Sequence, residues 1–446
     1  MIPGKLHYDA LPLWAQTLAV NVVSAWNFRR KYGAEFHRSL AALERFESAS
    51  LDQLLAHQQM ALHEMLKYAC RHVRYYKKQG LPSDHLSAWP IVEKRTVAIH
   101  PELFLSDEYK PESLLTLKTS GTTGTPLTVF VSPEYHQMEM AFRWRHKAWG
   151  GVPFLSRGAY LSGHPVVPPG QSHPPFWRVD HIEKRLLCSS YHFTPQALAS
   201  YVNALAGFHP DFVHGYPSSL YVLARHIMDH GGTTVRPRAV FTASETLLDF
   251  QREVIGKAFG APVFNWYGNT EMTCNIVQCA AGGLHYRTDY GLLELLDDGT
   301  MVCTTLNNRA MPLIRYRVGD VATARSGSCA CGCAFPLIER IEGRVEDYVQ
   351  TPDGRLIGRL DHLFKDATCV REAQIVQREL GEVVVRIVRE PGYSTDVEQV
   401  IRTEARLRLG ESTRVRFEYV ERIERTVSGK FRFVISELPH QHVACA

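Results

Sequence analysis

The sequence lacks the features that mark membrane-spanning, secreted or disulfide-stabilised proteins. Its 446 residues contain only 10 Cys, too few for a disulfide scaffold. The longest apolar stretch, residues 11–26, is interrupted by Gln16, Asn21 and Ser24 and falls short of the roughly 20 apolar residues of a spanning helix. The N-terminus shows no apolar core followed by a small-residue cleavage site. We therefore expect a cytoplasmic protein without a signal peptide.

A strong excess of charge is also missing. The 50 Lys and Arg and the 46 Asp and Glu leave a net charge of +4, too little to indicate nucleic-acid binding. Hydrophobic residues make up 45% and aromatic residues 10% of the chain, which argues against disorder. No internal repeat or low-complexity segment is present. The length allows about three domains.

The first 80 residues have a helical pattern, with few Gly or Pro and apolar residues three or four positions apart. In residues 11–26 this pattern is followed by the basic residues Arg29, Arg30 and Lys31. Such a helix either lies on a membrane surface or packs on the main domain, and packing is the interpretation we favour.

From about residue 113 onwards, β-branched runs alternate with helical stretches, as in an α/β protein. The expected strands 212–216, 239–243 and 262–266 should end at one crevice, because active-site loops follow the carboxyl ends of parallel strands. Residues 284–324 indicate antiparallel strands. Residues 382–388, 395–409 and 415–419 form a β-α-β pattern.

These patterns predict a large, multi-subdomain α/β N-terminal domain and a small, mobile α+β C-terminal domain. The expected boundaries are a helical extension over 1–50, the large domain over 51–345 and the small domain over 346–446.

A Ser/Thr/Gly-rich segment, TSGTTGTP at 119–126, is typical of a loop that binds phosphate. Its glycines let backbone N–H groups approach an anion, and its hydroxyls donate hydrogen bonds. It is not the P-loop of kinases and GTPases, because no Lys lies between Lys118 and Lys147. Taken alone, the segment is equally typical of a solvated turn.

Further motifs follow this loop in a fixed order. They are NWYGNTE at 265–271, YRVGD at 316–320, GRVED at 343–347 and SGK at 428–430. With the loop they resemble the adenylate-forming superfamily. WPIVEK at 89–94 and ACRHVRYY at 69–76 are similar to its phenylacetate–coenzyme A ligase and CapK-type branch. The resemblance implies that ATP activates a carboxylic acid to an acyl-adenylate and pyrophosphate, after which the acyl group passes to a nucleophile.

The resemblance also implies roles for single residues. Tyr267 would stack on adenine, Asp320 would accept the ribose hydroxyls, and Thr270 would touch the α-phosphate. Glu271 would hold Mg²⁺, which prefers carboxylate oxygen, and Lys430 would stabilise the charge that develops during attack. The implied ATP-binding residues are Ser120, Gly121, Thr122, Thr123, Gly124, Ser244, Glu245, Tyr267, Gly268, Asp320 and Arg344. Asp347 would be the hinge between the domains.

Two other sites are implied. The acid pocket would include His214, Gly215, Tyr216 and Trp144, with aromatic walls suited to an aromatic acid, although such aromatics are equally typical of a core. A structural zinc site would use four residues that match zinc ligands in this branch, Cys279, His285, Cys329 and Cys331. Cys333, where relatives carry Arg, either competes for a ligand role or is a plain thiol, and free buried cysteines are the alternative to zinc.

Several functions remain to be separated. The acceptor is either coenzyme A or an amine in a CapK-like role in glycan or secondary-metabolite synthesis, and the 50-residue N-terminal extension favours the CapK type. Intact Glu271, Asp320 and Lys430 argue against a non-catalytic nucleotide-binding scaffold. The near-neutral charge argues against nucleic-acid binding through the zinc element. A homodimer is compatible with the sequence.

Overall fold

A computed structural model of the protein describes residues 8–82, 85–118, 127–163, 166–168, 170–342, 348–357, 360–364, 367, 369–423 and 433–438. The chain divides into two compact units. The larger holds residues 1–117, 128–190 and 197–343, and the smaller holds 118–127, 191–196 and 344–446. The expected site residues outside the described residues are Ser120, Gly121, Thr122, Thr123, Gly124, Arg344, Asp347 and Lys430.

The larger unit begins with helices, as the apolar spacing predicts. They are α2 (Leu13–Lys31), α3 (Ala34–Glu44), α4 (Leu51–His72), α5 (Arg74–Lys77) and α6 (Lys94–Ile99). A capping box starts α4: the Ser50 hydroxyl accepts from the Gln53 amide, and the Gln53 side chain accepts from the Ser50 amide. Within the described residues, no helix has the length and hydropathy needed to span a membrane.

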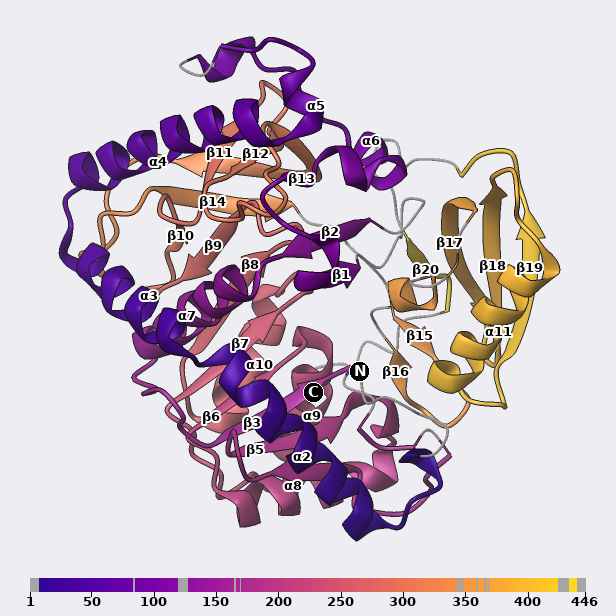
Figure 1. Ribbon diagram of the computed structural model, residues 1–446. Helices are drawn as coiled ribbons and strands as arrows, with labels where there is room; N and C mark the ends of the chain where they lie inside the picture. Colours follow the sequence, from indigo (N-terminus) through magenta and orange to yellow (C-terminus); the bar gives the residue numbers. More distant parts are fainter. Residues whose placement is uncertain are drawn as a thin grey trace. The chain divides into compact units, whose positions relative to one another are not determined.

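One large sheet forms the centre of this unit (Figure 1). Its strands are β3 (Gly158–Ser162), β4 (Trp177–Asp180), β5 (Arg185–Ser189), β6 (Phe212–Gly215), β7 (Ala239–Ala243), β8 (Val263–Gly268), β9 (Asn275–Gln278), β10 (Leu284–Tyr286), β11 (Gly291–Leu295), β12 (Thr300–Thr305), β13 (Tyr316–Arg325) and β14 (Leu337–Glu342). Among the described residues the order is β11-β12-β13-β14-β10-β9-β8-β7-β6-β3-β5-β4. The run from β8 to β5 is parallel, and the flanks are antiparallel. A separate two-stranded sheet pairs β1 (Leu115–Lys118) with β2 (Thr128–Val131).

Helices cover both faces of the parallel strands (Figure 1). They are α7 (Pro133–Trp149), α8 (Pro195–Phe208), α9 (Pro217–Asp229) and α10 (Asp249–Phe259). On one face, His146 of α7 lies 5.5 Å from the Phe241 ring and 6.0 Å from the Phe264 ring. On the other face α10 contacts β7 and β8, and its Arg252 donates to the carbonyl of Val263. Because side chains alternate along a strand, Phe264 and Val263 point to opposite faces. Short 3₁₀ helices occupy connections: η1 (Arg45–Ser48), η2 (Leu86–Ala88), η3 (Pro101–Leu103), η4 (Pro111–Ser113), η5 (Ser190–His192) and, in the smaller unit, η6 (Leu360–Phe364).

The three strand ends expected to carry the site lie on neighbouring parallel strands. Gly215 of β6 is opposite Thr242 of β7, and Ala243 is opposite Trp266 of β8. A side chain at Gly215 would place its Cβ 2.5 Å from the carbonyl oxygen of Leu161, so the close approach of β3 requires glycine. Neighbouring parallel strands end at one edge of a sheet, so the segments after β6, β7 and β8 start close together.

The smaller unit is a four-stranded sheet with one helix packed on it. Its elements are β15 (Val349–Gln350), β16 (Leu356–Ile357), β17 (Val370–Glu379), β18 (Glu382–Arg389), α11 (Thr395–Leu409), β19 (Arg414–Tyr419) and β20 (Val434–Ser436). The sheet order is β19-β18-β17-β20, and β15 pairs with β16. Ile401, Ala405 and Leu409, four residues apart on α11, join the core of this unit. The helix has the bounds that the sequence predicts.

Candidate nucleotide, acid and metal sites

A tight turn between β8 and β9 presents Thr270 and Glu271. Its backbone is fixed by Asn269, whose side-chain oxygen accepts from the Thr273 amide at 3.0 Å and whose side-chain nitrogen donates to the Thr273 hydroxyl at 2.8 Å. Met272 has a positive φ of 54°, which is uncommon outside glycine. The turn therefore holds the motif in one defined conformation.

The Glu271 carboxylate is buried, with 4% of the residue exposed. It accepts a 2.7 Å hydrogen bond from the Tyr316 hydroxyl, and the Lys94 ammonium lies 3.4 Å away. Burial alone would raise the pKa of this carboxyl, but Lys94 and Tyr316 outweigh it and lower the pKa below its ordinary value. Glu271 is thus held as a carboxylate, the form that ligates Mg²⁺.

Tyr267 and Asp320 come from different motifs and are joined directly. The Tyr267 hydroxyl donates to the Asp320 carboxylate at 2.7 Å, and the Asn275 side chain donates to the Tyr267 carbonyl at 2.9 Å. Burial and the neighbouring Asp320 raise the pKa of Tyr267, so its hydroxyl keeps the proton that it donates. Gly319, with a φ of 92°, lies in the irregular part of β13 directly before Asp320, where the pairing with β12 shifts register.

The segment after β7 carries Ser244 and Glu245. Ser244 has a positive φ of 72°, a strained conformation for this residue type. The Glu245 carboxylate accepts from the Ser218 amide at 3.0 Å and from the Ser218 hydroxyl at 3.1 Å. It therefore caps the first turn of α9, where a negative charge is favoured by the helix dipole. Among the described residues, Glu245 thus has a positioning role as well as its expected place beside ATP.

The expected acid-pocket residues His214 and Trp144 are linked through Phe212 and Tyr160. The Tyr160 ring lies 5.4 Å from His214 and 5.7 Å from Phe212, and Phe212 lies 6.2 Å from Trp144. Gly215 and Tyr216 follow His214 at the end of β6. Four of these rings therefore form one aromatic group on the α7 face of the sheet.

A buried lysine that the sequence did not single out lies in the same group. The Lys147 ammonium donates to the Tyr160 hydroxyl at 3.2 Å and sits 4.2 Å from the Trp144 ring centroid. Burial lowers the pKa of Lys147 to about 7, with further lowering from Arg143 and Arg185. Trp149, two residues further along α7, packs 5.7 Å from the His285 ring.

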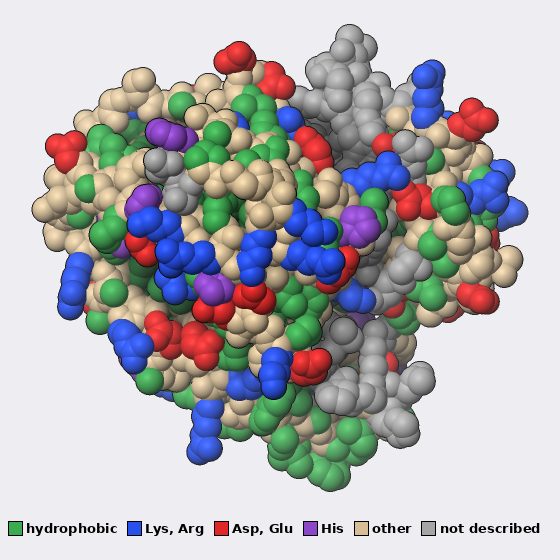
Figure 2. All heavy atoms as spheres, turned by 45° about the horizontal axis from the view of Figure 1, so that its top comes forward, with side chains coloured by type: hydrophobic (Ala, Val, Ile, Leu, Met, Phe, Trp, Pro, Cys, Tyr) green, Lys and Arg blue, Asp and Glu red, His purple; other side chains and the backbone are tan. Residues whose placement is uncertain are grey.

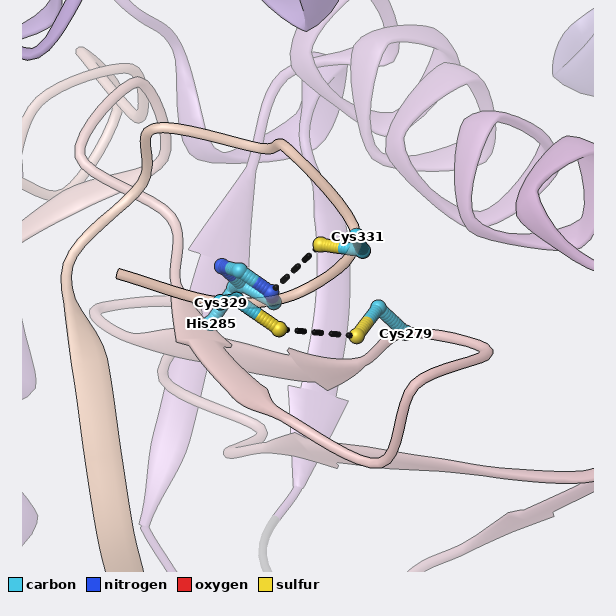
Figure 3. Close-up of side chains that lie close together, drawn as sticks. All are labelled: Cys279, His285, Cys329 and Cys331. Carbon is cyan, nitrogen blue, oxygen red and sulfur yellow. Dashed lines mark hydrogen bonds between the residues drawn. The ribbon is translucent and has the colours of Figure 1, made fainter. Parts of the chain in front are cut away.

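Cys279, His285, Cys329 and Cys331, the set that the family resemblance implies, come together (Figure 3). The Cys279 and Cys329 sulfurs are 3.6 Å apart, and the Cys331 sulfur is 3.3 Å from His285 Nε2. All four ligand atoms lie within 4.8 Å of one another. His285 Nδ1 is 3.1 Å from the carbonyl oxygen of Phe335, which turns Nε2 toward the thiols.

Glycines beside this cluster allow the backbone to approach the cysteine sulfurs closely. A side chain at Gly283 would place its Cβ 2.7 Å from the Cys329 sulfur. Gly282 and Gly332 have positive φ angles of 86° and 78°, as the turns beside the thiols require. Cys333 is not part of the four-residue group. Three thiols and one imidazole are the donor set of a tetrahedral structural zinc site.

The large α/β unit and the small α+β unit define the fold class: the chain has the fold of the adenylate-forming ligases. It superposes on 2-hydroxyisobutyryl-CoA ligase, in a structure with 2-HIB-AMP and CoA, with a TM-score of 0.54 and 18% identity. The match covers 88% of this chain and 92% of that chain.

The sequence comparisons are more specific. Residues 349–437 match the CapK C-terminal domain family. The chain is 24% identical to protein CapK of Staphylococcus aureus, covering 97% of this chain and 99% of that protein. It is 26% identical over 163 residues to phenylacetate-coenzyme A ligase of Thermus thermophilus, which is 33% of this chain and 37% of that protein. The resemblance to the adenylate-forming superfamily and its CapK-type branch is confirmed, and the enzyme class it implies, an ATP-dependent ligase, agrees with these comparisons.

Sequence reasoning missed Lys94, Tyr316 and Lys147 as site residues. Lys94 and Tyr316 stand in two quoted motifs, WPIVEK and YRVGD, so a signal was present, but their pairing with Glu271 is a tertiary contact. Lys147 lies in an ordinary amphipathic helix, and only packing shows its burial.

Proposed function

We propose that the protein activates a carboxylic acid with ATP, forming an acyl-adenylate and pyrophosphate, and then transfers the acyl group to an acceptor. The observation that carries this proposal is the pair of anchored carboxylates, Asp320 and Glu271. The Tyr267 hydroxyl donates to the Asp320 carboxylate, and the Tyr316 hydroxyl donates to the Glu271 carboxylate. Each of these hydrogen bonds joins the motif at 265–271 to the motif at 316–320, because each motif supplies one tyrosine and one carboxylate. Adenylation requires one carboxylate that accepts hydrogen bonds from the ribose hydroxyls and one that binds Mg²⁺.

The roles of the described residues follow from this arrangement. Asp320 would accept hydrogen bonds from the ribose, with Tyr267 stacking on adenine, and Glu271 would hold Mg²⁺ beside the phosphates. The Lys94 ammonium lies 3.4 Å from the Glu271 carboxylate and balances part of its charge. The phosphate loop and Lys430, which lie outside the described residues, would supply the donors to the triphosphate and to the developing charge.

Coenzyme A is the acceptor that we place first, by the likeness to phenylacetate-coenzyme A ligase. An amine acceptor, in a CapK-like role, is the second candidate. The match to CapK over 97% of the chain favours it, because that match includes the N-terminal helices. The two candidates share the first half-reaction.

The test of the proposal is ATP–pyrophosphate exchange over a panel of carboxylic acids that includes arylacetic, hydroxy and amino-substituted acids. Exchange that depends on one class of acid would support adenylation and identify the substrate. Active acids would then be offered coenzyme A or amines, with acyl-thioester and amide measured separately. A folded, zinc-loaded protein that catalyses no exchange with any acid would contradict the proposal.

Replacing Asp320 with Ala should weaken ATP binding by about 1.5–3 kcal/mol, the range for a hydrogen bond to a charged group. Calorimetric titration with ATP and Mg²⁺ measures this. The control is Tyr267→Phe, which keeps the ring and removes the hydroxyl that bonds Asp320; it should cost less. Unchanged ATP affinity in Asp320→Ala would remove this residue from the nucleotide site.

We also propose that Cys279, His285, Cys329 and Cys331 bind one structural zinc ion. The absence of an acidic ligand in the four-residue group supports a structural role. Metal analysis of the purified protein should find one zinc per chain. Acidification should release it before global unfolding, because thiolates must be protonated on release. Cys279→Ser should lower the zinc content, while Cys333→Ser should retain it. Loss of zinc in both variants, or in neither, would contradict this ligand set.

A further inference from the structure

The outer face of α2 is apolar although nothing in the described residues covers it. Its exposed side chains include Trp14, Leu18, Val22 and Trp26, which are 71%, 57%, 60% and 64% exposed. These four residues are spaced by four, so they form one stripe along the helix. We call these four residues the α2 stripe. Hydrophobic side chains gather in this way at the lower edge of the space-filling view (Figure 2).

The inner face of α2 is polar and is fixed to the β4–β5 hairpin. Gln16 accepts from the Arg178 guanidinium at 3.1 Å, Asn21 donates to the Val179 carbonyl at 2.9 Å, and Ser24 donates to the Asp180 carboxylate at 2.8 Å.

The last turn is anchored as well: the Lys31 ammonium lies 2.7 Å from the Glu183 carboxylate. Rolling the helix to bury the stripe would leave these polar groups without partners, which is costly. The polar-inside orientation is therefore fixed by the fold, and the stripe stays directed outward.

The charged residues within α2 have one sign. Residues 10–34 contain Arg29, Arg30 and Lys31 and no Asp or Glu. Lys31 forms an ion pair with Glu183, whereas Arg29 is exposed. The Arg30 guanidinium lies 4.4 Å from the Trp26 ring centroid. The stripe thus ends in cationic groups that complement an anionic surface.

The two tryptophans indicate what kind of surface this is. Trp14 and Trp26 lie toward opposite ends of the stripe. Both indole rings would therefore lie in the same interfacial layer of a bilayer if the helix axis were parallel to its surface. Indole rings favour the bilayer interface, where the ring contacts acyl chains and the N–H stays hydrated. A helix pair formed with a second copy of the chain would instead have to bury both indole N–H groups.

We propose that the α2 stripe docks the protein on the surface of a bilayer that contains anionic lipid. The helix lies in the plane of the interface, with the stripe directed into the acyl boundary and Arg29 and Arg30 at the headgroups. The association is peripheral and does not depend on the ligase activity proposed above.

Vesicle flotation of the full-length, zinc-loaded protein tests this. Wild-type protein should float with vesicles of phosphatidylcholine and phosphatidylserine, bind weakly to phosphatidylcholine alone, and lose binding as salt is raised. The intrinsic tryptophan emission should shift to the blue only with the anionic vesicles. Replacing Trp14, Leu18, Val22 and Trp26 together by Gln should lower the partition coefficient by about tenfold or more, since affinity follows the buried apolar area.

Matched variants separate the stripe from general surface apolarity. Met60→Gln with Phe250→Gln changes apolar side chains that are 62% and 51% exposed on other helices, and it should bind vesicles like wild type. Arg29→Glu with Arg30→Glu should abolish the preference for anionic lipid. All variants are checked for thermal unfolding like wild type.

Other outcomes overturn the proposal. One is wild-type protein that binds neither kind of vesicle. Another is light scattering that shows a dimer which the four-Gln variant converts to a monomer, without vesicle binding; the occupant would then be a second copy of the chain. A third is that the variant with Gln at the four stripe residues and the variant with Gln at Met60 and Phe250 both bind vesicles equally less than wild type.

Discussion

Lys430→Ala is expected to lose adenylation by about 100-fold or more, the effect of deleting one preorganised donor at the developing charge. The motif SGK at 428–430 belongs to the smaller unit. We propose that its ammonium would reach the acid and the α-phosphate in only one of two domain orientations, and that its charge would no longer be required once the adenylate exists. Lys430→Ala should therefore still consume a chemically supplied acyl-adenylate at close to the wild-type rate.

The complementary variant is Asp347→Pro, which fixes φ at the proposed hinge. It should release pyrophosphate normally on the first turnover and then transfer the acyl group slowly, because transfer requires the small domain to reorient. Single-turnover kinetics separates the two steps in both variants. If Lys430→Ala used the supplied adenylate as slowly as it formed its own, the two-orientation proposal would be wrong.

Asp289→Asn is expected to lower the free energy of unfolding by about 3–5 kcal/mol at neutral pH, because it leaves buried cations without their counter-ion. The Asp289 side chain is 1% exposed and lies 2.5 Å from Arg145 and 3.5 Å from Arg287. Glu47, which contacts both arginines, is 31% exposed and would compensate only in part. Denaturant unfolding of both proteins measures the difference.

The pH dependence of this effect has a definite sign. Burial alone would raise the pKa of the Asp289 carboxyl, but Arg145 and Arg287 outweigh it and lower the pKa to about 2. The folded state thus binds this proton less readily than the unfolded state does. The stabilisation is full above the unfolded pKa of about 3.9 and is lost as pH falls toward 2. The difference between wild type and Asp289→Asn should therefore shrink in that range.

An exposed pair provides the control. Glu253 and Lys257 form an ion pair 2.6 Å long on α10, with side chains 64% and 62% exposed. Glu253→Gln should leave the free energy of unfolding close to that of wild type, because water and salt screen an exposed ion pair. An Asp289→Asn effect as small as this would contradict the role assigned to the buried network.

Much of the fold could be predicted because its signals are local. The 3.6-residue spacing of apolar residues predicts α11 with its true bounds, and β-branched runs predict β6, β7 and β18 within one residue at either end. The motif order carries the resemblance to the superfamily, and that resemblance implies the four residues that cluster. These patterns depend on neighbours along the chain, so the sequence carries them directly.

The orientation of α2 could not be predicted in the same way. Residues 11–26 are apolar enough to indicate a buried helix, and packing on the main domain was indeed the favoured interpretation. The helix does pack there, but through Gln16, Asn21 and Ser24, because the β4–β5 hairpin offers polar partners. Which face of a helix is buried depends on what lies opposite, and that partner is more than 150 residues away in the chain.

By itself, the sequence determined the resemblance to the adenylate-forming ligases and many of the local elements, and it predicted the residues of the proposed nucleotide and metal sites. Only the tertiary structure decided that Lys94 and Tyr316 hold Glu271, that Tyr267 bonds Asp320, and that Asp289 neutralises two buried arginines. The physical reason is the distance along the chain between the residues that set each property. Helix and strand preferences come from residues a few positions apart, whereas the charge state of a buried group depends on every group that folding brings within hydrogen-bonding distance.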